Sequence, residues 1–331
     1  MKTPRLTLND VQQARLRLRG GMRLTPCAPA RAIGQIVGAN VWLKRDDLQR
    51  TGSFKERGAR HALLCLSLEK RSRGVVAASA GNHALGLAFH GGVLGVRVTV
   101  VMPLTAPAVK VARCRGLGAE VVLRGQTFEE AHAFASALAL ETRATLVHPF
   151  DDIRVIAGQG TMGCEILEQI HEVDTVVVPV GGGGLLAGVA TVVKALRPDV
   201  RVIAVEPENA AGFLAACLSG RPRAALLAPT LADGLAVAQV GETTFAIAAP
   251  LVDDVVTVSE GEIATAIRVL ACEEGIVAEG AGAVAVAAVL AGKVRGRALV
   301  LPIGGRNIDA RRHEQIVAGA FDGRTAWSCA A

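Results

Sequence analysis

Aromatic residues are scarce in this sequence of 331 residues: they make up 3% of it, and tyrosine is absent. The absence of tyrosine excludes every mechanism in which a phenol serves as acid or base. It also leaves few rings that could stack on nucleotide bases. The chemistry of this chain must therefore be carried by other side chains, and recognition of bases by stacking is not expected.

A dense basic stripe is also missing. The chain has 36 Lys and Arg against 30 Asp and Glu, a net charge of +6, but these residues are scattered. This distribution favours a surface biased toward small anions over nucleic-acid binding. The apolar runs GVATVVKAL and AVAVAAVLAG are too short to span a membrane and are flanked by loop signals. We expect neither nucleic acid nor a membrane as a partner.

The seven cysteines are widely spread and form no C-x-x-C pair, which argues against a disulfide framework or a zinc site. No signal peptide is evident. Arg15, Arg17 and Arg19 could suggest an organelle transit peptide, but the acidic Asp10 and the helical spacing favour an ordinary first helix. A reducing, cytoplasmic location is therefore expected.

Short β-branched runs alternate with longer Ala- and Leu-rich stretches, which is the pattern of parallel βαβ units. Several of these runs are apolar throughout, as expected for strands that helices cover on both faces. The pattern predicts an α/β protein with one or two open, mostly parallel sheets. The predicted strands are Val75–Ala78, Val96–Met102, Glu120–Leu123, Thr175–Val180, Val200–Val205, Asp254–Val258 and Ala298–Ile303.

Four consecutive glycines, Gly181–Gly184, lie between a predicted strand and a helix-like stretch. Glycine lets backbone N–H groups approach a phosphate at the positive end of a helix. The same loop also fits a dinucleotide-binding pattern, G-x-G-x-x-x-G, formed by Gly182, Gly184 and Gly188, with Glu206 placed to hold a ribose. An NAD-binding oxidoreductase therefore stays open at this point. A glycine turn without a ligand is disfavoured, because four glycines are entropically costly to order.

A lysine begins a second helix-like stretch in TGSFKERGA, residues Thr51–Ala59. The positive field at a helix N-terminus lowers the pKa of Lys55 and favours the neutral amine that attacks an aldehyde. Most isolated lysines are only surface charges, so the context of Lys55 must decide between the two interpretations.

A third loop, ASAGNHALG, again lies between a predicted strand and a helix. Ser79, Gly81, Asn82 and His83 offer donors to an anion at the carboxyl edge of a sheet, where ligands bind in open α/β folds. Ser79 and Asn82 could equally be helix caps. We interpret His83 as a packed or capping residue, because no carboxylate nearby in the sequence could orient it as a base.

Five motifs in register closely resemble the serine/threonine dehydratase (threonine ammonia-lyase) branch of fold-type II pyridoxal-phosphate enzymes. They are SFKERG, SAGNHA, GQGT (Gly158–Thr161), VGGGGL and EGAGA (Glu279–Ala283), and the resemblance extends from Leu24 to Asp309. It implies a tryptophan synthase β-like fold with two open, twisted, mostly parallel sheets and helices on both faces. We accordingly predict a large cofactor-binding domain of residues 1–73 and 152–331, and a small domain of residues 74–151.

The resemblance also implies the cofactor, pyridoxal 5'-phosphate, and the residues that hold it. Lys55 would carry the cofactor as a Schiff base and, once freed by the substrate amine, remove the Cα proton. Asn82 would lie beside the phenolic oxygen, Gly181, Gly182, Gly183 and Gly184 would bind the phosphate, and Gly304 would lie at the ring nitrogen. The substrate carboxylate would be received by Ser79, Gly81, Asn82 and His83.

The implied reaction dehydrates and deaminates a small β-hydroxy amino acid: L-threonine to 2-oxobutanoate and ammonia, or L-serine to pyruvate and ammonia. A serine racemase and a 3-hydroxyaspartate ammonia-lyase on the same fold stay as alternatives. Ala80 stands where related serine racemases carry a second serine as acid and base, which favours elimination. The dinucleotide alternative is now disfavoured, because it explains neither Lys55 nor the asparagine loop. The resemblance suggests a homodimer.

Besides Ala80, two positions depart from the family pattern. Glu206 and Ala210 match a stretch that often binds a divalent cation, but Gly212 stands where a further acid is expected, which argues against a bound Mg²⁺ or Ca²⁺. Gly304 replaces the serine or cysteine that faces the pyridine nitrogen in the family. Either Arg306 approaches the ring instead, or it points to solvent.

Overall fold

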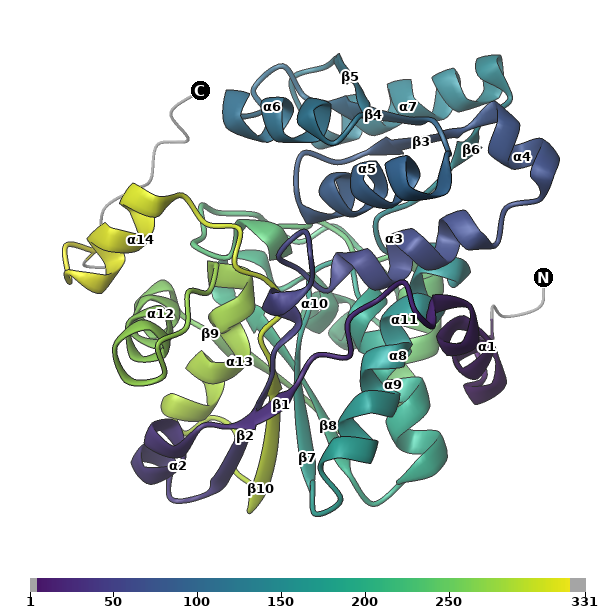
Figure 1. The fold of residues 1–331 in the computed structure, drawn as a ribbon. Coiled ribbons are helices and arrows are strands. Elements are labelled where there is room, and N and C mark those ends of the chain that lie inside the picture. The colour runs from purple at the N-terminus through teal and green to yellow at the C-terminus, as the bar shows by residue number, and fades with distance from the viewer. Residues whose placement is uncertain (1–4, 322–331) are drawn as a thin grey trace.

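A computed structural model describes residues 5–321 and shows an α/β protein with two separate sheets (Figure 1). The larger sheet has the strand order β1-β2-β10-β7-β8-β9 and is parallel except for the β1–β2 pair. Its strands are β1 (Cys27–Pro29), β2 (Asn40–Lys44), β7 (Thr175–Pro179), β8 (Arg201–Pro207), β9 (Asp254–Val258) and β10 (Ala298–Pro302). The smaller, fully parallel sheet has the order β5-β4-β3-β6. Its strands are β3 (Val75–Ala78), β4 (Val98–Met102), β5 (Glu120–Leu123) and β6 (Thr145–Leu146). The predicted fold class is confirmed.

All seven predicted strands are present, with ends displaced by two residues or fewer. Three further strands, β1, β2 and β6, were not predicted. Two of them are only three and two residues long, too short for a hydrophobic period to be visible in the sequence.

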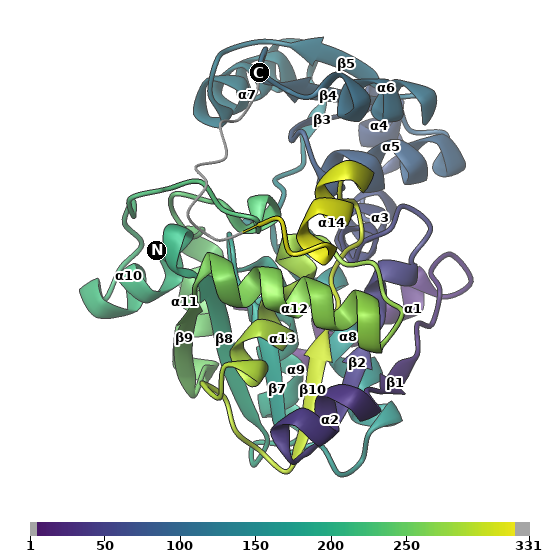
Figure 2. The same cartoon turned by 90° about the vertical axis from the view of Figure 1, so that its left-hand side faces the viewer.

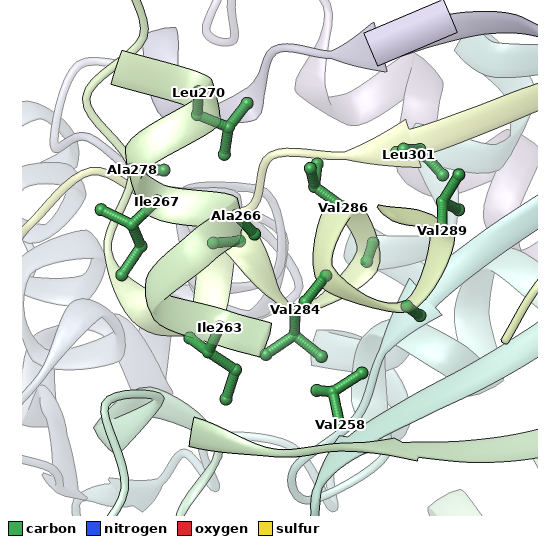
Figure 3. Packing of buried hydrophobic residues seen from close by; sticks show 14 of the residues in the cluster. Val258, Ile263, Ala266, Ile267, Leu270, Ala278, Val284, Val286, Val289 and Leu301 are labelled. Atoms are coloured by element: carbon green, nitrogen blue, oxygen red, sulfur yellow. The ribbon is translucent and has the colours of Figure 1, made fainter. Parts of the chain in front are cut away.

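Helices cover both faces of the larger sheet (Figure 2). One face packs against α1 (Leu8–Leu18), α8 (Ile153–Gln169), α9 (Gly184–Leu196), α10 (Gly212–Ser219) and α11 (Glu242–Ala248). The other packs against α2 (Arg31–Val37), α12 (Glu260–Glu273), α13 (Gly280–Leu290) and α14 (Ala310–Val317). Along β7, Val176 and Val178 face the first layer and Val177 the second. Figure 3 shows the second layer, in which α12 and α13 interlock beside Val258 and Leu301. The central strands β7 and β10 are almost entirely apolar because both of their faces are buried.

The smaller sheet is covered by α7 (Phe128–Thr142) on one face and by α3 (Lys55–Leu64), α5 (Asn82–Leu94) and α6 (Ala108–Gly116) on the other. A short helix, α4 (Leu68–Arg73), leads from α3 to β3. Helix α3 lies between the two sheets and packs on both α5 and α8 (Figure 1). Its close approach to α8 requires Gly58 and Gly158, since a Cβ on Gly158 would overlap the backbone of Gly58. The domain boundaries near residues 74 and 151 stay a prediction.

The N-terminal segment forms the ordinary helix that the sequence predicts. Thr7 and Asp10 make a capping box at the start of α1, with the Asp10 carboxylate accepting from the Thr7 N–H at 2.9 Å. The six cysteines between residues 27 and 272 carry free thiols, and Cys329 lies outside the described residues. Across residues 5–321, every helix is too short or too polar to cross a bilayer.

Candidate active site

A cavity of about 860 Å³ opens at the carboxyl ends of β3, β7 and β10. The loops that follow these strands all reach it, which is where ligands bind in open α/β sheets. The cavity is lined by every residue that the sequence assigns to the cofactor or the substrate, namely Lys55, Ser79, Gly81, Asn82, His83, Gly181, Gly182, Gly183, Gly184 and Gly304. These residues lie as far as 249 positions apart in the chain, and the fold brings them together.

Lys55 is the first residue of α3, and its amine faces the cavity. The Nζ atom donates a hydrogen bond to the carbonyl of Pro149 at 2.9 Å and lies 5.3 Å from the centroid of the Phe54 ring. Burial lowers the pKa of Lys55 to about 8, opposed in part by the negative charge of Glu279. A substantial fraction of the amine is therefore neutral near pH 8, and the neutral amine is the form that attacks an aldehyde.

The four-glycine loop leads into α9 and leaves its backbone donors free. Gly183, the residue before the helix, has φ +89°, a left-handed conformation that favours glycine. Among residues 5–321, no side chain caps this helix, and no acceptor binds the N–H groups of Gly181–Gly184. Thr244 holds the loop from behind, donating to the Gly182 carbonyl at 2.7 Å, and Asp151 accepts from the Thr244 N–H at 3.0 Å. The loop thus offers free donors at the positive end of a helix, as a phosphate requires.

The asparagine loop ends in a second uncapped helix. Gly81 precedes α5, and no side chain within the described residues caps the helix, so Asn82 and Ser79 are not its caps. Ser79 instead accepts from the Gly81 N–H at 3.2 Å. The N–H groups of Asn82 and His83 donate to no protein acceptor in the described part of the chain. This helix end is therefore available to a second anion, such as a carboxylate.

His83 is buried beneath this loop. Its Nε2 atom lies 3.3 Å from the carbonyl of Val147. Burial, reinforced by the positive charge of Lys55, lowers the pKa of His83 to about 3. A buried ring with so low a pKa is poorly suited to act as a base, and the sequence-based interpretation of His83 as a packed residue stays a prediction.

Glu279 and Asn307 hold Asn82 from two sides, and neither was predicted as a site residue. Asn82 donates to Glu279 Oε1 at 2.8 Å, and Asn307 donates to Asn82 Oδ1 at 2.6 Å. Glu279 is 6% exposed and lines the cavity; burial, with the negative charge of Asp233, raises the pKa of Glu279 to about 7. Glu279 opens the EGAGA motif just before α13, which is the one sequence signal that could have indicated it.

Glu206 and Ala210 lie outside the cavity lining. Both oxygens of Glu206 are engaged at the start of α10, accepting from the N–H groups of Phe213 at 2.7 Å and Leu214 at 2.8 Å. Burial raises the pKa of Glu206 to about 7. Residues 5–321 contain no group of three or more His, Cys, Asp and Glu side chains arranged to hold a metal ion.

Gly304 and Arg306, which follow β10, differ in their position relative to the cavity. Gly304 lines the cavity, and a Cβ there would lie 3.2 Å from the Phe54 ring. Arg306 is exposed and is not part of the lining, so its side chain points to solvent.

The residues present fit pyridoxal phosphate. Lys55 supplies an amine with a lowered pKa, the loop before α9 supplies unpaired N–H groups for a phosphate, and Asn82 supplies an amide held in place.

Comparison with known proteins agrees with this geometry. The sequence model of the family described as "Pyridoxal-phosphate dependent enzyme" matches residues 18–304. An L-threonine ammonia-lyase of Thermotoga maritima is 45% identical over 313 residues, which cover 94% of this chain and 78% of that protein. The solved structure of a threonine deaminase from T.th. is similar with a TM-score of 0.87 at 42% identity, covering 92% of this chain and 99% of that one. A serine racemase from Dictyostelium discoideum has a TM-score of 0.86 at 36% identity, with the same coverage of 92% and 99%.

Proposed function

Because this chain belongs to the family of pyridoxal-phosphate dependent enzymes, we propose that it is an L-threonine ammonia-lyase, which converts L-threonine to 2-oxobutanoate and ammonia. L-Serine, which would give pyruvate, is the expected secondary substrate. The observation that carries the proposal is the placement of the Lys55 amine in one cavity with two uncapped helix N-termini. The threonine-cleaving relatives support the choice of substrate.

The cofactor would be held by Lys55, by the donors of Gly181–Gly184 around its phosphate, and by Asn82, with Gly304 at its ring nitrogen. When bound, it withdraws electrons from the substrate Cα. Lys55 then removes the proton from Cα, a task suited to an amine with a pKa of about 8. Gly304 has no side chain and so offers the ring nitrogen of the cofactor neither a hydroxyl nor a thiol. The exposed side chain of Arg306 does not take over that contact.

The substrate carboxylate would bind at the N-terminus of α5, in the loop formed by Ser79, Gly81, Asn82 and His83. The unpaired N–H groups there act as donors, and the partial positive charge of the helix end favours an anion. Because His83 is neutral, its contribution is to shape the loop rather than to supply charge.

The charges around the cavity oppose a substrate with a second carboxylate. Within the described residues, Lys55 is the one Lys or Arg side chain of the lining. Five carboxylates share that lining: Glu129, Asp151, Asp233, Glu242 and Glu279. A monocarboxylate such as threonine is therefore favoured over 3-hydroxyaspartate, since the added carboxylate would meet like charges and no Lys or Arg of the described lining other than Lys55.

Elimination is favoured over racemisation because Ala80 lines the cavity without a group that can carry a proton. A serine at that position could protonate Cα from the face opposite Lys55, as racemisation requires.

Three further properties complete the proposal. We expect activity to need no divalent cation, because Gly212 supplies no carboxylate beside Glu206 and both Glu206 oxygens already accept backbone hydrogen bonds. Dialysis against EDTA should leave activity unchanged, and stimulation by added Mg²⁺ or Ca²⁺ would contradict this.

The free thiols of the described cysteines favour the reducing cytoplasm. The chain is expected to form a homodimer, which light scattering can measure.

The proposal is tested by comparing Lys55→Ala with Lys70→Ala, which changes an exposed lysine on α4. The wild type and Lys70→Ala should be yellow and produce 2-oxobutanoate, whereas Lys55→Ala should lose both the visible band and the activity. A colourless wild-type protein would overturn the proposal.

A substrate panel tests the specificity. We expect 2-oxo acid from L-threonine at the highest rate, then from L-serine, with little from D-serine or 3-hydroxyaspartate. D-Serine formation that outpaces pyruvate formation from L-serine would identify a racemase instead.

A further inference from the structure

We propose that Asn307 is a positioning residue that fixes the orientation of the Asn82 amide, so that one Asn82 N–H always faces the cavity. Asn307 itself is absent from the cavity lining and is half-buried behind Asn82. The inference rests on the proposed function, because it concerns how this chain presents Asn82 to the bound cofactor.

The orientation of the Asn307 amide is set by two partners of fixed chemistry. Its Nδ2 lies 2.8 Å from the carbonyl oxygen of Thr51, which can only accept a hydrogen bond. Its Oδ1 lies 3.0 Å from a guanidinium nitrogen of Arg113, which can only donate. Turning the amide over would place donor against donor and acceptor against acceptor at both contacts. Asn307 therefore has one stable orientation.

This orientation is passed on to Asn82. The second Nδ2 hydrogen of Asn307 points to Asn82 Oδ1 at 2.6 Å, so the Asn82 amide nitrogen must face the other way. There it donates to Glu279 Oε1 at 2.8 Å, and Glu279 Oε2 accepts from the Asn307 N–H at 3.1 Å. Glu279 uses one of the two Asn82 N–H hydrogens. The other is left for the cavity, where the phenolic oxygen of the cofactor is expected.

The hydrogen-bond chain also crosses between the two sheets. Arg113 lies on α6 and Asn82 on α5, both packed on the smaller sheet. Asn307 follows β10 of the larger sheet, and Glu279 precedes α13, which packs on that sheet. The orientation of Asn82 is therefore fixed only while the two sheets keep their observed separation.

The sharpest test is Asn307→Asp, which keeps the shape of the side chain but removes both N–H donors. The oxygen that replaces Nδ2 would face Thr51 O and Asn82 Oδ1, so the Asn82 amide would no longer be held with its nitrogen toward the cavity. In the holoenzyme we expect the visible band of the cofactor to shift to shorter wavelength. We also expect kcat/KM for L-threonine to fall about tenfold, the size of one lost hydrogen bond.

Variants at Arg113 test the same chain from its exposed end. Arg113→Glu places an acceptor against Asn307 Oδ1 and should shift the visible band in the same direction. Arg113→Lys retains a donor and should have the same spectrum as the wild type. Arg115→Glu, the same charge change on the exposed side of α6, is the matched control and should leave the spectrum unchanged.

The outcomes separate this inference from the proposed function. A coloured wild type with an unshifted band in Asn307→Asp would overturn the positioning role alone, even if that variant were less stable to heat. A band shift of equal size in Arg115→Glu would also overturn it, because the effect would then be one of charge. A colourless wild type would remove the proposed function and this inference together.

Discussion

Arg57 and Asp46 form a bidentate ion pair in the protein interior. The distance from Arg57 Nε to Asp46 Oδ2 is 2.6 Å, and that from a terminal guanidinium nitrogen of Arg57 to Asp46 Oδ1 is 2.8 Å. Arg57 also contacts both oxygens of Glu165 on α8, at 2.6 and 2.7 Å. The three side chains are at most 9% exposed. Because Arg57 follows Lys55 by two residues on α3, this cluster fixes the helix that carries the reactive amine.

Replacing Arg57 with methionine should lower the free energy of unfolding by about 3–5 kcal/mol, because the buried carboxylate of Asp46 loses its ion-pair partner and Glu165 keeps only Lys44. Urea denaturation measures the change. The matched control is Arg15→Met, which breaks an ion pair with Glu168 whose side chains are 42% and 54% exposed. That variant should lose less than about 1 kcal/mol. Equal losses in the two variants would contradict the structural importance of the buried cluster.

Gly182→Ala should weaken cofactor binding about tenfold or more, since relieving such an overlap costs about 1–3 kcal/mol. A Cβ at this position would overlap the ring of Phe150, so the four-glycine loop would have to move. Titration of the apoprotein with pyridoxal phosphate measures the affinity. Gly116→Ala adds the same atom at the end of α6, where nothing lies within 4 Å, and should bind as the wild type does.

The rate at which the apoprotein takes up pyridoxal phosphate should rise about tenfold per pH unit below pH 8 and level off above it. The reason is that burial lowers the pKa of Lys55 to about 8, and only the neutral amine reacts with the aldehyde. Stopped-flow absorbance gives the rate. An uptake rate that still climbs steeply between pH 9 and pH 10 would show that the lysine titrates normally.

Stability should fall as the pH rises from about 4.5 to about 7, in part because of Glu206. Burial raises the pKa of this carboxyl from 4.5 to about 7, so the folded protein binds more protons than the unfolded chain in this window. Glu206→Gln should flatten the fall by up to about 1.4 kcal/mol per pH unit, whatever its absolute stability. Glu279 titrates in the same window and should leave a residual slope.

Thermal unfolding at successive pH values measures this dependence. Glu208→Gln is the control, because Glu208 is 51% exposed at its side chain. If Glu206→Gln and the wild type gave parallel curves, Glu206 would be ionised as in an unfolded chain.

Local sequence patterns predict most of this fold. The interior strands β3, β4, β7 and β10 are mainly apolar runs bounded by loops, and their positions follow from hydrophobicity, whereas the interior strand β2 (NVWLK) mixes polar and apolar residues and was not predicted. The order of the strands does not, because β10 lies between β2 and β7 through contacts between distant segments. The antiparallel β1 at the sheet edge is three residues long and has no pattern of its own.

The candidate site, like the fold, can be predicted only in part from local sequence patterns. Lys55, Asn82 and the glycine loop lie in motifs that can be recognised one at a time, and all of them line the cavity. Glu279 and Asn307 act through contacts with Asn82 across 197 and 225 positions of the chain. No spacing rule connects residues so far apart, and their partnership becomes visible only in three dimensions.

Helices α9 and α5, whose uncapped N-termini line the cavity, pack on different sheets: α9 on the larger one and α5 on the smaller one. A ligand with a negative group at each end would interact with both helix ends at once. It would therefore hold together the larger and the smaller sheet with their helices, which share no strand. Either group alone engages only one half. The distance between the two negative groups of a ligand, as well as their charge, therefore determines how tightly it binds in this cavity.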